Sequence, residues 1–248
     1  MDLTEPTSAE STGNDAWFRT THWSVVSMAG QASPQADAAL ANLCHTYWYP
    51  LYVFIRRQGQ GPEDAKDLVQ GFFAQVLQKR YFHDANREKG KFRSFVLLAL
   101  KRFMANEWDR AHRLKRGGGQ EVFSLDQEKT ENRYLTELVD TMSPEKAFDR
   151  QWAMVLLEQV LKGLEAEFSA AGRSSVFEEL KVYLSGEENA PSYAEMGQKL
   201  AMTEGSVKVT VCRLRQRYRE LLRETIASTV DGPEAVNEEI RHLFAALS

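Results

Sequence analysis

Apolar residues recur every three or four positions along most of the chain, which is the period of an amphipathic α-helix. The first stripe of this kind consists of Leu40, Leu43, Tyr47, Leu51, Phe54 and Ile55. No stretch alternates apolar and polar residues convincingly, as a half-buried strand would. The pattern therefore predicts an all-α protein.

Prolines and glycines divide this pattern into separate helices. Pro50 is expected to kink or divide the first helix, because proline lacks a backbone N–H donor. Pro62 opens the second helix and is followed by acidic residues, which the helix dipole favours in a first turn. Phe92 begins a long third helix that stops at the three glycines 117–119.

Beyond these glycines, residues 120–143 are acidic and weakly periodic, which is typical of a linker rather than of a domain core. A second helical block begins at Ser143-Pro144. Its predicted inward stripe is Phe148, Trp152, Val155, Leu156, Val160 and Leu164. Two Ser-x-x-Glu spacings, at 175–178 and 192–195, match helix capping boxes.

These boundaries predict two small helical domains joined by an acidic linker. We expect a disordered lead-in (1–20), a first domain (21–116), the linker (117–143), a second domain (144–226) and an amphipathic tail helix (227–248). The apolar face of the tail helix consists of Val236, Ile240, Leu243, Phe244 and Leu247. We expect this face to pack on the adjacent domain. The alternative is that it contacts the first domain and restrains the binding of a partner.

The composition, with 43% hydrophobic and 27% charged residues, is that of a soluble globular protein. The uncharged run 94–100 is far shorter than the roughly 20 residues that span a bilayer. The N-terminus has neither the basic start nor the apolar run of a signal peptide. Cys44 and Cys212 lie far apart in the sequence, so we expect a reduced, cytoplasmic protein without a disulfide framework or structural zinc.

The net charge of −4 hides two basic islands. Residues 87–116 carry ten Lys or Arg against three acidic residues, a balance of +7. Residues 203–223 carry six against two, a balance of +4. This asymmetry indicates two contacts with a polyanion. The alternative is that the basic side chains only solvate helix faces.

The second island has the pattern of a helix-turn-helix. The residues expected to face inward are Tyr193, Met196, Leu200, Val207, Val211, Leu214, Tyr218 and Leu221. Thr203 is the predicted N-cap of the second helix. Side chains at the start of such a helix reach base edges, and arginines further along meet phosphates. Two helices with a short turn also occur in purely structural bundles.

The first island lies on the long central helix. Its predicted inward stripe is Leu97, Leu100, Met104, Trp108 and Ala111. Another face carries Arg102, Asn106, Asp109, Arg110 and Arg113. Such a face combines hydrogen-bonding groups for bases with cations for phosphates. We expect Trp108 to be a core aromatic, whereas Phe103 either stacks on a base or fills the core.

Together, these features resemble a known family. "DAKDLVQGFF", then "FRSFVLLALKRFMANEWDRAHRLKR", a linker and "SYAEMGQKLAMTEGSVKVTVCRLRQRYRELL" are similar to bacterial RNA polymerase sigma factors of the two-domain extracytoplasmic-function (ECF) type of the sigma-70 family. The resemblance covers roughly residues 37–116 and 145–225. The chain departs from the family pattern at Gly71, where glutamate is common, and at Ala201, near the usual glycine of the turn.

The resemblance implies a transcription initiation factor that is not an enzyme and needs no cofactor or metal. Its region 2-like first domain would bind the clamp helices of core RNA polymerase through Asp64, Asp67, Gln70 and Phe73. The loop 84–91 would hold a flipped base of the minus-ten element. The melted strand would contact Lys91, Arg93, Lys101, Arg102, Asn106, Arg110 and Arg113.

The region 4-like second domain would read the duplex minus-thirty-five element of promoter DNA. The residues implied are Thr203, Ser206, Lys208, Val209, Cys212, Arg213 and Arg217. The acidic linker would enter the polymerase channel toward the RNA path. An anti-sigma protein is a further partner that the family admits, and no membrane contact is implied.

Two other classes of protein compete with this interpretation. A helix-turn-helix regulator with a helical sensor domain would bind duplex DNA without being a polymerase subunit, but it leaves the first basic island unexplained. An enzyme acting on nucleic acid is disfavoured, because the sequence has no Walker loop, no Gly-x-Ser-x-Gly and no clustered metal carboxylates.

Overall fold

The computed structural model describes residues 34–78, 91–113, 127–136, 142–185, 190–230 and 232–248. All regular secondary structure in these segments is helical, so the all-α prediction is confirmed. The predicted lead-in 1–20, residues 84–90 of the predicted flipped-base loop and residues 117–126 of the predicted linker lie outside the described segments.

The first half of the chain contains α2 (Pro34–Arg57), α3 (Pro62–Gln78), α4 (Phe92–Arg113) and the short α5 (Gln127–Thr136). The second half begins with the long α6 (Pro144–Ala170), followed by α7 (Ser174–Leu180) and the 3-10 turn η2 (Lys181–Tyr183). Three further helices complete it: α8 (Tyr193–Leu200), α9 (Glu204–Ala227) and α10 (Gly232–Leu247).

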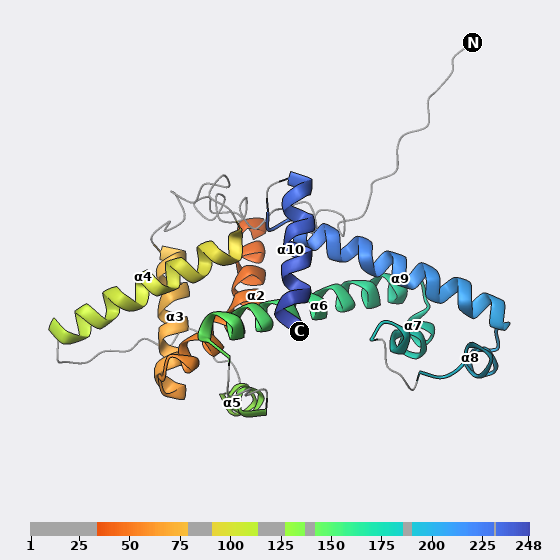
Figure 1. The fold of residues 1–248 in the computed structure, drawn as a ribbon, viewed down its shortest axis with the longest axis horizontal. Coiled ribbons are helices and arrows are strands. Elements are labelled where there is room, and N and C mark those ends of the chain that lie inside the picture. Colours follow the sequence, from red (N-terminus) through yellow and green to blue (C-terminus); the bar gives the residue numbers. More distant parts are fainter. Residues whose placement is uncertain (1–33, 79–90, 114–126, 137–141, 186–189, 231) are drawn as a thin grey trace, which may run out of the picture.

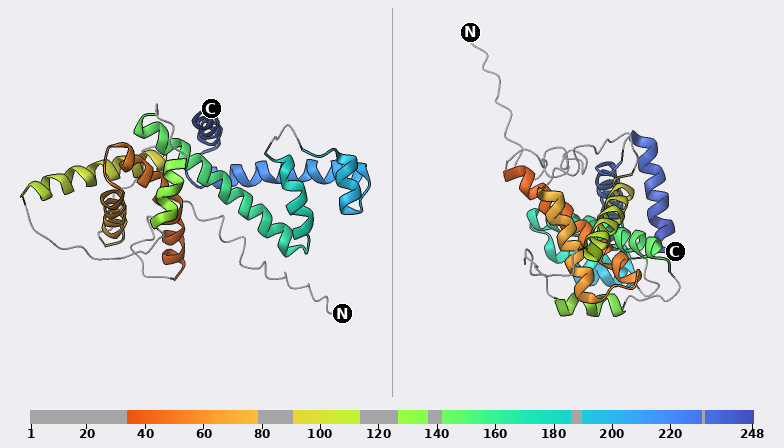
Figure 2. Two further views of the ribbon diagram at one scale, coloured as in Figure 1. Left: turned by 90° about the horizontal axis from the view of Figure 1, so that it is seen from below. Right: turned by 90° about the vertical axis from the view of Figure 1, so that its left-hand side faces the viewer.

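The long helix α6 connects the two halves. It packs on α2 of the first half and on α9 and α10 of the second (Figures 1 and 2). All six residues of its predicted stripe are buried, including Trp152 at 0% exposure. The buried side chains of both halves form one continuous cluster. The division into two domains therefore stays a prediction, because helices of both halves share α6.

Local capping signals explain several helix boundaries. Ser143 caps α6 by accepting a hydrogen bond from the Lys146 N–H. The predicted capping box at 192–195 is confirmed at the start of α8. The one predicted at 175–178 is wrong, since α7 begins at Ser174 and its N-cap residue makes no side-chain cap. Pro50 lies inside α2 and does not divide it.

A polar contact fastens α5, which lies within the predicted linker, to α2. Arg56 Nη2 lies 2.6 Å from Glu131 Oε1, and the Tyr52 hydroxyl donates to the same carboxylate. The Arg56 guanidinium also stands over the Tyr134 ring, 4.8 Å from its centroid. At least part of the predicted linker is therefore a helix docked on the first half. The apolar periodicity of this segment is weak because one carboxylate, Glu131, and one buried ring, Tyr134, anchor it instead of a full apolar stripe.

This contact makes stability depend on pH. Burial opposes ionisation of Glu131, but hydrogen bonds from Arg56 and Tyr52 outweigh it and hold the pKa of Glu131 below its usual value of 4.5. The stabilisation is therefore complete above pH 4.5 and is lost as the pH falls through the lower folded-state pKa. We expect Glu131→Gln to lower the free energy of unfolding by roughly 1–2 kcal/mol at pH 7 and progressively less in acid.

Urea unfolding at pH 7 and at pH 3 measures this effect. Glu158→Gln is the matched control, because Glu158 pairs with Lys162 on the surface of α6 and its removal should cost less than about 0.5 kcal/mol. Equal losses in the two variants, or a Glu131→Gln loss that does not change with pH, would contradict the assignment.

Candidate nucleic-acid interface

Helix α4 changes from a buried helix to an exposed one along its length. Val96, Leu100 and Phe103 are buried, whereas the described side chains from position 105 onward are exposed or half-buried. In Figures 1 and 2 the later part of α4 extends past α3. The start of α4 therefore belongs to the core, and its end presents side chains to solvent.

The two aromatic residues of this helix have different environments. Phe103 is buried, with its ring edge-on to Phe72 at a centroid distance of 5.8 Å, so it fills the core. A Cβ at Gly71 would lie 3.2 Å from the Phe103 ring, so a larger residue at this position would require the ring to shift by a few tenths of an ångström. The prediction that Trp108 is a core residue is wrong, because 65% of its surface is exposed. Residue 108 lies beyond the part of α4 that packs against the rest of the protein.

Arg102 and Asn106, one helical turn apart, form an exposed polar face on α4. Neither makes an ion pair or side-chain hydrogen bond within the described part of the chain. Arg110 is 70% exposed and lies 3.5 Å from Glu107, which is a weak contact. The Arg113 side chain lies outside the described residues.

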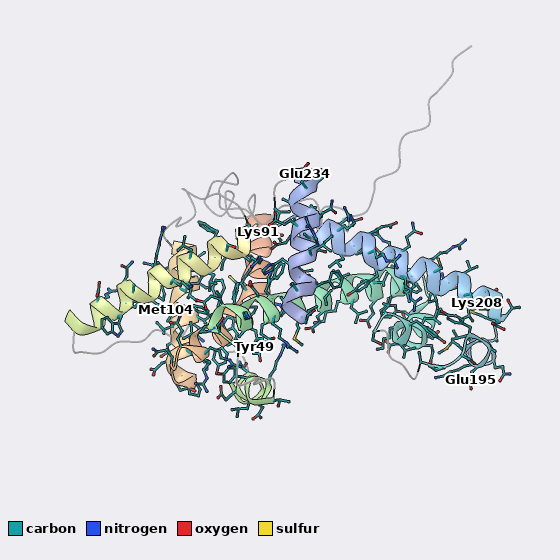
Figure 3. All side chains as sticks on the ribbon, viewed as in Figure 1. Tyr49, Lys91, Met104, Glu195, Lys208 and Glu234 are labelled. Carbon is teal, nitrogen blue, oxygen red and sulfur yellow. The ribbon has the colours of Figure 1, made fainter. Side chains whose placement is uncertain are left out.

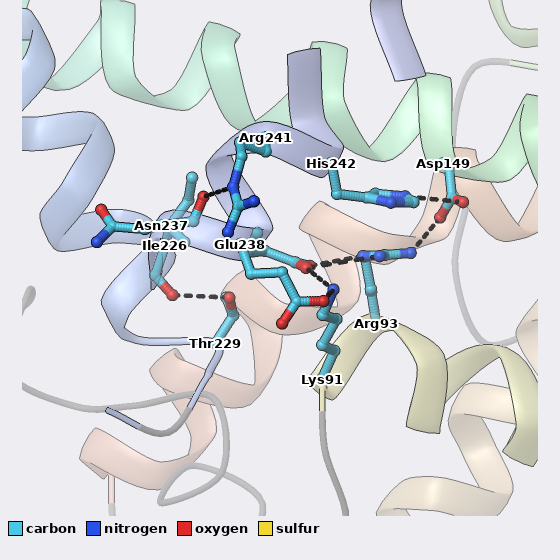
Figure 4. A network of polar contacts seen from close by, with 10 residues as sticks. Lys91, Arg93, Asp149, Ile226, Thr229, Asn237, Glu238, Arg241 and His242 are labelled. Atoms are coloured by element: carbon cyan, nitrogen blue, oxygen red, sulfur yellow. Dashed lines mark hydrogen bonds and ion pairs between the residues drawn. The ribbon is translucent and has the colours of Figure 1, made fainter. Parts of the chain in front are cut away.

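Three other predicted DNA contacts on this segment are already bound to carboxylates. Lys91 Nζ lies 2.9 Å from Glu238 and 3.2 Å from Glu239 of α10 (Figure 4). Arg93 is buried, and its guanidinium contacts both Glu239 and Asp149, as described below. Lys101 Nζ lies 2.8 Å from a glutamate at the start of α6. Of the six predicted residues whose side chains are described, three (Arg102, Asn106 and Arg110) are exposed on α4 and three (Lys91, Arg93 and Lys101) are paired with carboxylates of other helices.

The predicted helix-turn-helix geometry is present in α8 and α9. All eight predicted inward residues are buried or half-buried, and Thr203 caps α9 by accepting from the Ser206 N–H. The turn between the helices is tight: the Met202 N–H donates to the Gly197 carbonyl, and Ala201 adopts the left-handed conformation at φ 52°. A glycine would adopt this conformation without strain.

The start of α9 presents a mixed surface to solvent. Val209 is 51% exposed, and Cys212 and Arg213 are exposed as well. Within the described chain, Arg213 makes no ion pair. Lys208 Nζ lies 2.6 Å from Glu204, whose carboxylate raises the pKa of the lysine above its usual value. Such exposed pairs are weak, so a phosphate can replace the glutamate at little cost.

Two arginines further along α9 have structural roles. Arg217 was predicted to meet phosphate, yet its guanidinium lies 2.7 Å from Glu167 and 3.2 Å from Glu224. The hydrogen bond to Glu167 raises the pKa of Arg217 above its usual value. Arg215 donates to the Tyr183 carbonyl at 2.9 Å. These side chains hold α9 against α6 and η2.

The predicted polymerase-binding residues are divided between the surface and the core. Asp64 and Asp67 are exposed on α3, and Gln70 is half-buried. Phe73 is buried at 4% exposure beside Phe72. The exposed part of the predicted surface is therefore acidic, and Phe73 stabilises the helix that carries it.

The described residues contain no cluster of three or more His, Cys, Asp or Glu side chains that could hold a metal ion. Burial raises the pKa of the Cys44 thiol to about 12, so this cysteine is inert as a nucleophile at neutral pH. In the same part of the chain, no helix is long and apolar enough to cross a membrane.

Comparisons of the chain with protein-family models, with curated proteins and with solved structures find no match. The resemblance to sigma factors therefore depends on the motifs quoted above and on their order. The two exposed surfaces, on α4 and at the start of α9, give separate structural support for a function.

The tight turn of the helix-turn-helix gives a stability test. A Cβ at Gly197 would lie 2.7 Å from the Met202 carbonyl oxygen, so Gly197→Ala forces the backbone of the turn to move. We expect it to lower the free energy of unfolding by roughly 2–3 kcal/mol. Ala201→Gly should raise it by about 1 kcal/mol, because it relieves the left-handed strain.

Gly205→Ala is the control, since nothing lies within 4 Å of a Cβ at that position of α9. It should be neutral or stabilising, because alanine favours a helix. Urea unfolding of the three variants measures their free energies of unfolding and so their order of stability. A Gly197→Ala protein as stable as the Gly205→Ala protein would show that the turn has a different geometry.

Proposed function

We propose that this chain is a transcription initiation factor that binds core RNA polymerase, recognises promoter DNA and helps to melt it. One observation carries the proposal. The capped helix-turn-helix (α8 and α9) and the exposed end of α4, which carries Trp108 and basic side chains, lie toward opposite ends of the molecule (Figure 1). Met104 on α4 and Lys208 on α9 mark these two regions (Figure 3). The two surfaces suit two different forms of DNA.

The surface at the start of α9 suits duplex DNA. A helix that follows a short turn fits the major groove with its first residues toward the bases. Val209 offers an apolar surface for a thymine methyl group, and Arg213 offers a guanidinium for a guanine or a phosphate. Thr203 and Ser206 are engaged in capping α9, so they position the helix rather than supply its main contacts.

The exposed face of α4 suits unpaired DNA. Arg102 and Asn106 supply a cation and an amide on one face, and the exposed Trp108 ring offers a flat surface on another face of the same helix. Aromatic rings bind unpaired bases by stacking, and cations bind the phosphates beside them. A protein that reads only duplex DNA has no use for such a ring. This feature therefore favours an initiation factor over a plain regulator.

The proposed partner is core RNA polymerase, contacted through the exposed acidic residues Asp64 and Asp67 of α3. An acidic helix face is complementary to a basic partner. We propose a cytoplasmic location, because the DNA and the polymerase are there. The proposed initiation factor catalyses no reaction itself. Its two domains and their linker would separate or reorient when the protein binds the polymerase.

Lys208→Ala combined with Arg213→Ala tests duplex recognition. The probe is a set of duplexes selected by the wild-type protein from a random library. We expect the double variant to bind them at least about tenfold more weakly, because each lost contact to a base or phosphate costs 1–3 kcal/mol. Co-purification with core RNA polymerase should be unchanged, since the proposed polymerase contacts are on α3.

Lys146→Ala combined with Lys162→Ala is the matched control, because it removes the same charge from α6. Its duplex affinity should stay within about twofold of the wild type. If the wild-type protein binds duplex DNA but never co-purifies with core polymerase, the protein is a plain regulator and the proposal is wrong.

Trp108→Ala tests the single-strand surface. We expect binding of a single-stranded oligonucleotide, measured by fluorescence anisotropy, to weaken about tenfold, since stacking on one base is worth about 1–3 kcal/mol. Trp108→Phe should retain part of the affinity. Leu98→Ala removes an exposed apolar residue of the same helix without a ring and should change little. Similar losses for Leu98→Ala and Trp108→Ala would rule out stacking.

A further inference from the structure

The tail helix α10 lies against the start of α4, the middle of α6 and the end of α9 (Figure 4). Its buried residues are Val236, Glu239 and Leu243, while Phe244 is 56% exposed. A carboxylate at the centre of this contact is unusual, because a buried charge must be compensated. The polar part of the contact therefore determines where α10 lies.

Two cations contact that carboxylate, and two further carboxylates contact the same cations. Glu239 lies 2.5 Å from Arg93 Nε and 3.2 Å from Lys91 Nζ. Glu238, which is 61% exposed, lies 2.9 Å from the same Lys91 amine. Asp149 completes the network, with Arg93 at 2.5 Å and His242 at 3.1 Å. Two carboxylates of α10 thus bind the two cations at the start of α4.

The same end of α4 is also attached to the end of α9. The Phe92 N–H donates to the Thr229 carbonyl at 3.2 Å, immediately before α10 begins. The segment that carries Glu238 and Glu239 is therefore held where the two candidate DNA-binding helices meet. A change in the position of α10 affects both of them.

The chemistry of this contact allows exchange with another anion. Lysine and arginine bind carboxylate and phosphate oxygens with the same donors and similar distances. When α10 leaves, Arg93 keeps Asp149 of α6 as a partner but loses the Glu239 carboxylate, and Lys91 loses both of its carboxylates. A phosphate of a nucleic acid can take the place of the lost carboxylates.

We propose that α10 is a regulatory helix whose Glu238 and Glu239 occupy a phosphate-binding site formed by Lys91 and Arg93, and that nucleic-acid phosphate displaces it. The inference rests on the proposed function only in naming DNA as the competing polyanion. In the closed state, Lys91 and Arg93 are bound to α10 and unavailable to DNA. In the open state, they add two phosphate contacts at the start of α4.

The experiment compares Glu238→Gln combined with Glu239→Gln against the wild type. The probe is a fluorescein-labelled 20-nucleotide oligo(dT). We expect about tenfold tighter binding by the variant at low salt, because two cations no longer have carboxylate competitors. The slope of log affinity against log salt should steepen by about 1.4, since each phosphate contact on a single strand contributes about 0.7.

Glu165→Gln combined with Glu234→Gln is the control, because it makes the same charge change at exposed residues with no ion pair within the described chain. Its affinity and salt slope should stay near those of the wild type. Since Glu239 is buried, the variant's fold is checked by circular dichroism. Hydrogen exchange of the unaltered protein gives a second test: residues 232–248 should exchange faster when oligo(dT) is saturating.

Equal affinity of the two double variants would overturn the inference, as would unchanged exchange of residues 232–248 at saturation. These outcomes differ from failure of the proposed function. Tighter oligo(dT) binding by a protein that never binds polymerase would support the role of α10 and reject the initiation factor. No change in affinity, in a protein that does bind polymerase, would reject the role of α10 alone.

Discussion

A buried arginine keeps its charge, so Arg93 can lie in the interior only if carboxylates accompany it. Asp149, 56 positions along the chain, and Glu239, 146 positions along, supply them. This requirement brings α4, α6 and α10 to one place. Removing one partner of such a network costs about 3–5 kcal/mol, so the network is decisive for where the C-terminal helix lies.

The same principle explains how an acidic chain presents basic surfaces. Four of the basic residues in the two islands, Lys91, Arg93, Lys101 and Arg217, are bound by acidic residues from other helices. Others, such as Arg102 on α4 and Arg213 and Arg219 on α9, are exposed without an ion pair in the described chain. Pairing, rather than the local number of Lys and Arg, determines which side chains are available to a ligand.

Features set by neighbouring residues could be predicted from the sequence. Ser192 with Glu195, Thr203 and the apolar stripe of α9 are local signals, and each was predicted correctly. Features could not be predicted from the sequence when they depend on where a neighbouring helix ends or on which distant side chain contacts a residue. The exposure of Trp108 follows from α4 extending past α3, and the burial of Arg93 follows from an acidic tail far along the chain.

The two surfaces that we propose to face DNA differ in composition from those that the family resemblance implies. On α4 the geometry leaves Arg102, Asn106, Trp108 and Arg110 exposed, and it leaves Lys91 and Arg93 bound to α10. It leaves Val209, Cys212 and Arg213 accessible at the start of α9.

The most direct test of the central claim is RNA synthesis in vitro, with bacterial core RNA polymerase and genomic DNA fragments as template. Sequencing the 5′ ends of the RNA reports where transcription starts. The account predicts discrete start sites that appear only when this protein is added and that share two sequence elements upstream. A folded protein that binds DNA but produces no such start sites would contradict it.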